Sequence, residues 1–254
     1  MISVTIVCFN EAEKLEKCLK SLIGFADEII ILDLGSSDES REIAQKYGAK
    51  VLRHEFVLYV ESVRNFAISK TTGDWILVLD PDEVLTSALK EELKQITKEN
   101  KYDAVNIPRK NIFFGKWISH TNWWPDKHIR FFRKNKVSWD NKIHSYPVTQ
   151  GKILEVSAKE ELAIIHYGYD NISHFIDRQN RYSEIESKER YEEGERFSWG
   201  KFFWWPTREF LVRFIKHQGY LDGFYGFTLT FLMMVYKITV LVKLWEQDKE
   251  GREG

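Results

Sequence analysis

The apolar segment Trp75–Leu79 ends in an acidic run, Asp80-Pro81-Asp82-Glu83. Three carboxylates therefore follow directly where a buried strand should reach the surface at its C-terminal end. Burying like charges this close together is unfavourable, and a divalent cation would relieve the repulsion. Ligands of open α/β sheets bind at the carboxyl ends of the strands. The run predicts a ligand or metal site at this position; the alternative is a solvated acidic turn that caps the next helix.

The first hundred residues alternate between two hydrophobic periods. Short apolar runs predict buried strands at 2–8, 28–32, 51–52 and 75–79. Residues with helical spacing lie between and after them, and predict helices ending near Gly24, from Asp38 to Tyr47, from Val60 to Ser69 and from Thr86 to Thr97. This order predicts an α/β fold with a mostly parallel sheet flanked by helices on both faces.

Composition limits the class of protein. The chain has 254 residues, of which 43% are hydrophobic, and a formal net charge of -1, which fits a folded protein without a nucleic-acid-binding field. It holds two cysteines, Cys8 and Cys18, both at positions expected to be buried. We therefore expect a cytoplasmic protein in a reducing compartment, and the N-terminal strand shows no signal-sequence pattern.

Three polar clusters fall at the expected ends of strands: Phe9-Asn10-Glu11, the turn 33–38, and the acidic run 80–83. A nucleotide lying across this edge of the sheet would explain all three together. Each cluster also has a local explanation, such as a turn residue or a helix N-cap. The chain lacks both G-x-G-x-x-G and a glycine loop ending in Gly-Lys-Ser, which argues against a dehydrogenase and a P-loop ATPase.

These motifs, together with the segment Gly73–Glu83, resemble family 2 glycosyltransferases with the GT-A fold. Within the family they resemble the branch of the lipopolysaccharide core glucosyltransferases. The resemblance is strong to about residue 110, and continues more loosely through 123–144 and 219–223. It implies a glycosyltransferase domain at 1–170, with a nucleotide-sugar half at about 1–110 and an acceptor half at about 111–170. A helical, aromatic and basic extension would follow at 171–254.

The resemblance implies roles on the donor side of the site. The residues expected to contact the nucleotide sugar are Phe9, Asn10 and Glu11 in the nucleotide pocket, Asp33 at the base, Arg64 near the diphosphate or sugar, and Asp80 at the ribose. Asp80 and Asp82 would form a D-x-D pair in which Asp82 binds Mg²⁺ or Mn²⁺, since hard cations take oxygen ligands.

On the acceptor side, the family resemblance points to Asp126 as the catalytic base and to Arg130 as a group that orients the acceptor or a phosphate. His144 would reach the metal or the diphosphate, and His166 is a second histidine candidate. A turn role for Asp126, a structural ion pair for Arg130 and structural roles for both histidines are the alternatives. Trp124, with Trp117 and Trp123, could stack on a sugar ring or pack in the core.

The C-terminal part of the chain is aromatic and basic. Residues 171–195 predict an exposed helix, and residues 199–245 carry fourteen aromatic side chains with six Lys or Arg against two acids. This composition favours helices that lie on an anionic membrane face. Two alternatives are a buried helix pair that forms an oligomer contact, and a helix that spans the membrane.

The sequence thus predicts a metal-dependent inverting transferase that moves a hexose from a nucleotide-diphosphate sugar, expected to be a UDP-sugar. The acceptor would be a glycan or glycolipid such as a lipopolysaccharide core, met at the inner face of the cytoplasmic membrane. A catalytically silent membrane scaffold of the same fold, and a transferase with a protein acceptor, are the alternatives.

Overall fold

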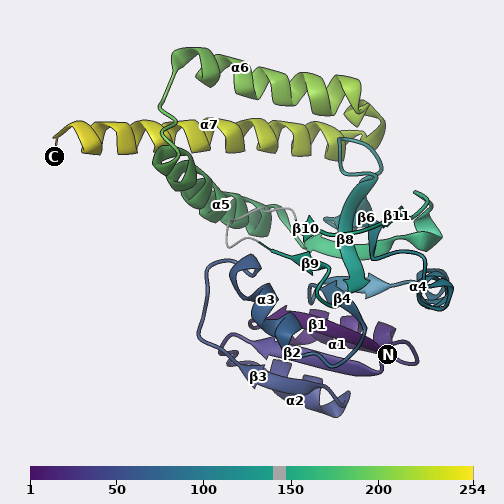
Figure 1. The fold of residues 1–254 in the computed structure, drawn as a ribbon. Helices are drawn as coiled ribbons and strands as arrows, with labels where there is room; N and C mark the ends of the chain where they lie inside the picture. The colour runs from purple at the N-terminus through teal and green to yellow at the C-terminus, as the bar shows by residue number, and fades with distance from the viewer. Residues whose placement is uncertain (140–146, 254) are drawn as a thin grey trace. The chain divides into compact units, whose positions relative to one another are not determined.

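The computed structural model describes residues 1–139 and 147–253 (Figure 1). The chain divides into two compact units. The first comprises residues 1–110 and 126–167, and the second comprises residues 111–125 and 168–254. Residues 111–125 lie inside the range expected for the acceptor half, but they belong to the second unit. His144 falls outside the described residues.

The first unit begins with four parallel strands in the order β3-β2-β1-β4. They are β1 (Ile2–Cys8), β2 (Glu28–Asp33), β3 (Lys50–Arg53) and β4 (Trp75–Leu79). The helices that follow them are α1 (Ala12–Leu22), α2 (Ser40–Lys46), α3 (Glu61–Ser69) and α4 (Ser87–Glu99). Cys8 lies opposite Asp33 and Ile6 lies opposite Leu79, so the polar segments after β1, β2 and β4 emerge at one edge. The predicted α/β fold is confirmed.

Beyond β4 the sheet continues through β8, β6, β12 and β5, and the pairs β4–β8, β8–β6 and β12–β5 are antiparallel. These strands are β5 (Glu83–Leu85), β6 (Ala104–Phe113), β8 (Asp126–Arg133) and β12 (Ile164–Tyr169). Shorter elements complete this part: β7 (Lys116–Trp117), β9 (Val137–Ser138), β10 (Val148–Thr149), β11 (Ile153–Glu155) and the 3-10 turn η1 (Glu160–Leu162). The β6–β8 pairing places residues of two sequence-distant strands beside the acidic run.

The core of the first unit is built from the predicted apolar positions. Leu15, Cys18, Leu19 and Leu22 form the buried face of α1. Trp75 of β4 stacks on Phe131 of β8 with ring centroids 4.7 Å apart, which joins the parallel and antiparallel strands. Cys8 and Cys18 are both free thiols and buried, as expected.

The second unit is mostly helical. It contains α5 (Ile172–Glu192), α6 (Trp199–Phe210), a π-helical segment η2 (Leu211–Lys216), a 3-10 turn η3 (Gly219–Asp222) and α7 (Phe224–Glu253). Helix α7 packs against both α5 and α6. Phe113 and Phe175 pack with Leu229 and Met233 of α7 in the core of this unit.

Candidate active site

The loops after β1 and β2 are joined by the side chain of Asn10. Its Oδ1 accepts hydrogen bonds from the backbone N–H groups of Ser37, at 2.7 Å, and Asp38, at 3.3 Å. Asn10 adopts a left-handed conformation with φ of 53°, which brings the carboxamide over the second loop. Neighbouring Phe9 is partly exposed and packs edge-on against Phe56, with centroids 4.9 Å apart. Asn10 thus fixes the loop after β2 through its hydrogen bonds to the backbone of Ser37 and Asp38.

Asp33 ends β2 and is fully buried. One carboxylate oxygen accepts from the Ser36 N–H at 3.0 Å. The other, Oδ2, lies 3.9 Å from the Arg41 Nε and has no hydrogen-bond donor among the described residues. A buried acceptor without a donor is costly, so a ligand N–H at this position would stabilise it. This geometry fits the predicted contact with a nucleobase.

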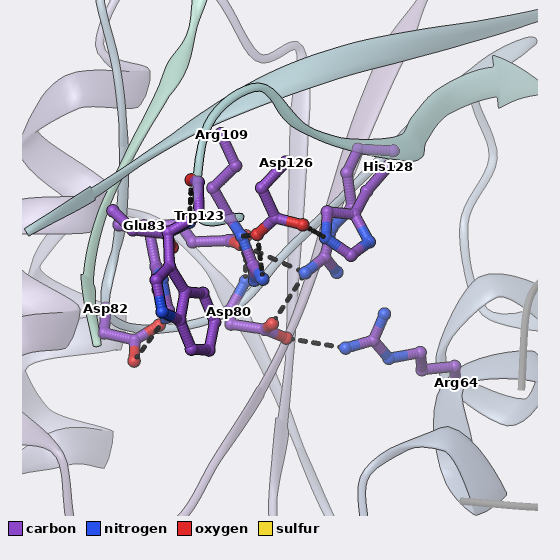
Figure 2. A network of polar contacts seen from close by, with 11 residues as sticks. Arg64, Asp80, Asp82, Glu83, Arg109, Trp123, Asp126 and His128 are labelled. Atoms are coloured by element: carbon purple, nitrogen blue, oxygen red, sulfur yellow. Dashed lines mark hydrogen bonds and ion pairs between the residues drawn. The ribbon is translucent and has the colours of Figure 1, made fainter. Parts of the chain in front are cut away.

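Asp80 lies between two arginines (Figure 2). Its Oδ1 accepts from Arg64 Nη2 at 2.8 Å, and its Oδ2 accepts from Arg130 Nη2 at 2.8 Å. Burial by itself would raise the pKa of Asp80, but the charges of Arg130 and Arg64 outweigh burial and hold that pKa well below its ordinary value. Asp80 is therefore ionised at neutral pH, and three predicted site residues meet in one cluster.

Glu83, the last acid of the run, is completely buried and organises the turn. Its Oε2 accepts from the backbone N–H of Asp80 at 2.9 Å. Its Oε1 accepts hydrogen bonds from Arg130 Nη2 at 3.0 Å and from Arg109 Nη1 at 3.4 Å. Glu83 thus links the two arginines, and the acidic run is a paired cluster, in contrast to a solvated turn.

Asp126 is the first residue of β8 and lies opposite Arg109 of β6 in the strand register. Arg109 donates to its Oδ2 from Nε at 2.9 Å and from Nη2 at 2.7 Å. His128 Nε2 lies 2.9 Å from the other oxygen, Oδ1. Burial and the charge of Arg109 lower the pKa of His128, so the neutral ring donates its Nε2–H to Asp126. Both carboxylate oxygens of Asp126 are therefore held in fixed directions (Figure 2).

Asp82 contacts a histidine of β12. Its Oδ2 is 3.4 Å from Nε2 of His166, which is held opposite Glu83 by the pairing of β12 with β5. No group of three or more possible metal ligands occurs in the part of the chain that the structure describes. One carboxylate and one imidazole can bind a divalent cation when diphosphate oxygens and water complete its shell. The donor set at Asp82 fits this arrangement, with His166 as the histidine.

The remaining predicted residues divide between the units. Glu11 ends the loop after β1, and its backbone N–H donates to Ser40 Oγ at 3.2 Å. Trp124 belongs to the second unit, where it packs edge-on against Trp117 with centroids 5.5 Å apart. Sequence reasoning included Glu83 only as part of the acidic run and missed Arg109 and His128 as site residues. Polar and apolar residues do not alternate regularly along 104–113, so no local pattern singles out Arg109.

Comparison with known proteins identifies the family of the chain. Residues 3–161 match the model of glycosyl transferase family 2. The chain belongs to this family and is a glycosyltransferase. The predicted family resemblance is thereby confirmed.

Two relatives match nearly the whole chain. An uncharacterized glycosyltransferase of Rickettsia typhi is 28% identical over 264 residues, which covers 99% of this chain and 89% of the relative. The lipopolysaccharide core biosynthesis glycosyltransferase LpsC of Rhizobium meliloti is 24% identical over 253 residues, which covers 97% of this chain and 92% of the relative.

Among solved structures, the fold is similar to that of S. aureus TarS 1–349 in complex with UDP-GlcNAc. The TM-score is 0.51 at 17% sequence identity, and the match covers 73% of this chain and 64% of the TarS chain. The GT-A type of fold is thus confirmed.

Asp80→Asn should weaken the acid dependence of stability. The pKa of Asp80 is lowered by folding, so its contribution is fully present above the pKa of an unfolded aspartate, about 3.9. That contribution is lost as pH falls toward the lower folded pKa. Urea denaturation at pH values below about 5 should therefore give a steeper fall in the free energy of unfolding for the wild type than for the variant.

Asp74→Asn is the control for this series, because the Asp74 side chain is 77% exposed and pairs only with the chain's amino terminus among the described residues. It should keep the wild-type slope. An Asp80→Asn slope equal to that of the wild type would contradict the ion-pair assignment.

Proposed function

We propose that this protein is a metal-dependent inverting glycosyltransferase that moves a hexose from a UDP-sugar to a lipid-linked glycan such as a lipopolysaccharide core. The observation that carries the proposal is the cluster of Asp80, Arg64 and Arg130 at the sheet edge that also holds the buried Asp33. The UDP-GlcNAc in the TarS complex supports the donor class. The printed name of LpsC supports the acceptor class.

On the donor side, the nucleobase would donate an N–H to Oδ2 of Asp33, and the ribose hydroxyls would donate to Asp80. Arg130 Nε and Nη1 are buried and have no hydrogen-bond acceptor among the described residues. Diphosphate oxygens would supply acceptors for these N–H groups. Asp82 would hold Mg²⁺ or Mn²⁺ with His166 or His144, and the cation would neutralise charge on the leaving diphosphate.

On the acceptor side, Asp126 would take the proton of the attacking hydroxyl. The hydroxyl oxygen forms a bond to the anomeric carbon while the bond from that carbon to the diphosphate oxygen breaks. Attack from the opposite face inverts the anomeric configuration. Hydrogen bonds from Arg109 and His128 fix the orientation of the Asp126 carboxylate. Trp124 would stack on the acceptor sugar.

We place the protein in the cytoplasm, where its two free thiols would stay reduced. A catalytically silent scaffold would need neither the paired acid–arginine cluster nor the oriented Asp126. A protein acceptor remains the alternative for the second substrate, and product analysis by mass spectrometry would separate it from a lipid-linked glycan.

The second unit would contact the cytoplasmic face of the membrane through α6, η2, η3 and α7. One side of α7 is buried in its unit, and exposed apolar residues recur along the other side at helical spacing: Phe224, Phe227, Phe231, Val235, Val242 and Trp245. Helix α6, packed beside α7, exposes Trp199, Phe203 and Trp204. Aromatic side chains of this kind are favoured at membrane interfaces.

Charge favours an anionic bilayer as the partner of this surface. Arg208 of α6 and Lys216 of η2 are exposed. The acid between them, Glu209, is paired with Arg213 at 2.8 Å. The helical residues 224–250 are long and apolar enough to cross a membrane. Their apolar 18-residue stretch has a mean hydropathy of 1.7, and 39% of that stretch is buried inside the protein. A helix packed on one side and exposed on the other suits a position on the bilayer surface.

Calorimetry with nucleotide sugars tests the donor and the metal together. UDP-glucose, UDP-galactose, UDP-N-acetylglucosamine and GDP-mannose are titrated with Mn²⁺ and then with EDTA. One UDP-sugar should bind, more weakly in EDTA, and Asp82→Asn should lose the part of the affinity that depends on Mn²⁺. If the folded protein binds none of the four donors, the result favours the catalytically silent scaffold. If Asp82→Asn binds the donor as the wild type does, the assignment of Asp82 as a metal ligand is wrong.

Asp126→Asn should abolish most of the transfer while donor affinity is unchanged. Removal of a general base typically costs a factor of about 10² to 10⁴ in rate. Transfer to a lipopolysaccharide core preparation is measured through the release of UDP. The control is Asp103→Asn, a carboxylate of similar exposure that accepts from the Lys152 N–H at 2.9 Å, and it should keep its activity. Lost donor binding in Asp126→Asn would contradict the role of base.

Vesicle sedimentation tests the membrane surface. The triple variant Phe203→Ser, Phe227→Ser, Phe231→Ser should bind vesicles containing phosphatidylglycerol at least about tenfold more weakly than the wild type. Leu58→Ser, which removes an exposed leucine of the first unit, should bind as the wild type does. Equal binding by the triple variant would contradict the proposal. Resistance to carbonate extraction would point to a spanning helix, and loss of a dimer in the triple variant to contact between copies.

A further inference from the structure

A buried carboxylate in the second unit has no part in the acid–arginine cluster. Asp222 ends the turn η3 immediately before α7, and its side chain is 2% exposed. It lies in the segment Gly219–Gly223. The looser part of the family resemblance includes this segment, but none of its residues has been given a role so far. The turn is tightly built, because a Cβ on Gly226 would lie 1.8 Å from the Gly219 carbonyl oxygen. Asp222 is therefore held at a fixed position.

The carboxylate of Asp222 gathers the donors of one short loop. It accepts from the backbone N–H groups of Ser119, at 3.2 Å, and His120, at 3.0 Å. It also accepts from the hydroxyls of Thr121, at 2.7 Å, and Ser119, at 3.2 Å. These four donors come from three consecutive residues. Hydrogen bonds to a charged acceptor are the stronger kind, so Asp222 fixes the backbone of 119–121.

The loop has a backbone that needs such support. Thr121 and Asn122 are consecutive left-handed residues, with φ of 57° and 62°. A β-branched residue in this region is a conformational outlier and costs free energy. Two further bonds hold it: the Thr121 N–H donates to the His217 carbonyl at 3.1 Å, and Arg213 Nη1 donates to the Thr121 carbonyl at 3.0 Å. Strained backbone that surrounding bonds maintain is typical of functional sites.

The loop leads directly to the proposed acceptor side. Trp123 and Trp124 follow Asn122, and Pro125 connects them to Asp126. The Arg213 guanidinium lies over the Trp123 ring at 5.1 Å, and Asn111 Nδ2 donates to the Trp123 carbonyl at 3.0 Å. The residues that hold Thr121 therefore also hold the tryptophans that precede Asp126.

We propose that Asp222 is a positioning residue for transfer: it fixes the backbone of the loop 119–125, whose last residue is bonded directly to Asp126. The inference rests on the proposed function. Because Asp222 acts on the acceptor-side loop, its loss should lower kcat and leave donor affinity unchanged. A shift of about 1 Å in a reacting group can cost about 100-fold in rate.

Asp222→Asn tests the role, with Asp248→Asn as the matched control. Asp248 is also a buried carboxylate of the second unit, and it accepts from the Phe197 N–H at 2.7 Å. In Asp222→Asn, amide exchange in the peptide 117–125 should accelerate, and kcat for UDP release with a lipopolysaccharide core preparation should fall about 10- to 100-fold. Affinity for UDP-glucose or whichever donor the wild type binds should stay within about twofold. Asp248→Asn should leave both the loop exchange and kcat near wild-type values.

Unchanged exchange in the peptide 117–125 of Asp222→Asn would overturn the inference, as would equal losses of kcat in Asp222→Asn and Asp248→Asn. If Asp222→Asn does not fold, Thr121→Val removes the shortest of the four bonds and Thr121→Ser retains its hydroxyl. The serine variant should then keep more of kcat than the valine variant, and the reverse order would contradict the proposal. If the wild type shows no transfer at all, that result counts against the proposed function. The amide-exchange measurement does not depend on transfer, so it still tests whether Asp222 fixes the loop.

Discussion

The buried ion pairs of Arg130 are the interaction on which the rest of the first unit depends. One nitrogen, Nη2, reaches both Asp80 at 2.8 Å and Glu83 at 3.0 Å, and the side chain is almost fully buried. Isolated charges at this depth would cost several kcal/mol each, so the cluster is stable only while every member has a partner. Because Arg130 comes from β8, the acid turn after β4 can be buried only if β8 pairs beside β4.

The same cluster leaves some arginine N–H groups without a hydrogen-bond acceptor among the described residues. Three acids meet three arginines, since Arg64 reaches Asp80 and Arg109 reaches both Glu83 and Asp126. The formal charges of these six residues therefore balance, and the N–H groups without an acceptor in the described part of the chain include Arg64 Nε and Arg130 Nε. Fixed, desolvated cations of this kind can stabilise negative charge with little reorganisation. The ion pairs that stabilise the fold thus leave buried arginine N–H groups that a bound anion could pair with under the proposed function.

The sequence predicts the parallel strands and the acidic edge well, because both depend on short-range patterns. Apolar runs identify β1 and β4, and the acids that follow them mark the edge where the polar segments emerge. The partners of those acids depend on the long-range pairing of β6 with β8, which includes a register shift between Val105 and Asn106. No local pattern in the sequence specifies that register, so Arg109 and His128 were not predicted as site residues. Asn10 was predicted to line the pocket, and its observed hydrogen bonds are to the backbone of the neighbouring loop.

Asp126 shows how two constraints meet at one residue. On one side it is fixed by the strand register, because Arg109 lies directly opposite and donates two hydrogen bonds to a single oxygen. On the other side it follows the loop 119–125, whose strained backbone depends on Asp222 and Arg213 of the second unit. In the proposed role of base, the Asp126 carboxylate would have to keep its orientation while its proton affinity changes during the reaction. The hydrogen bonds from Arg109 and His128 hold both of its oxygens, and the proposed effect of Asp222 would reach it only along the chain.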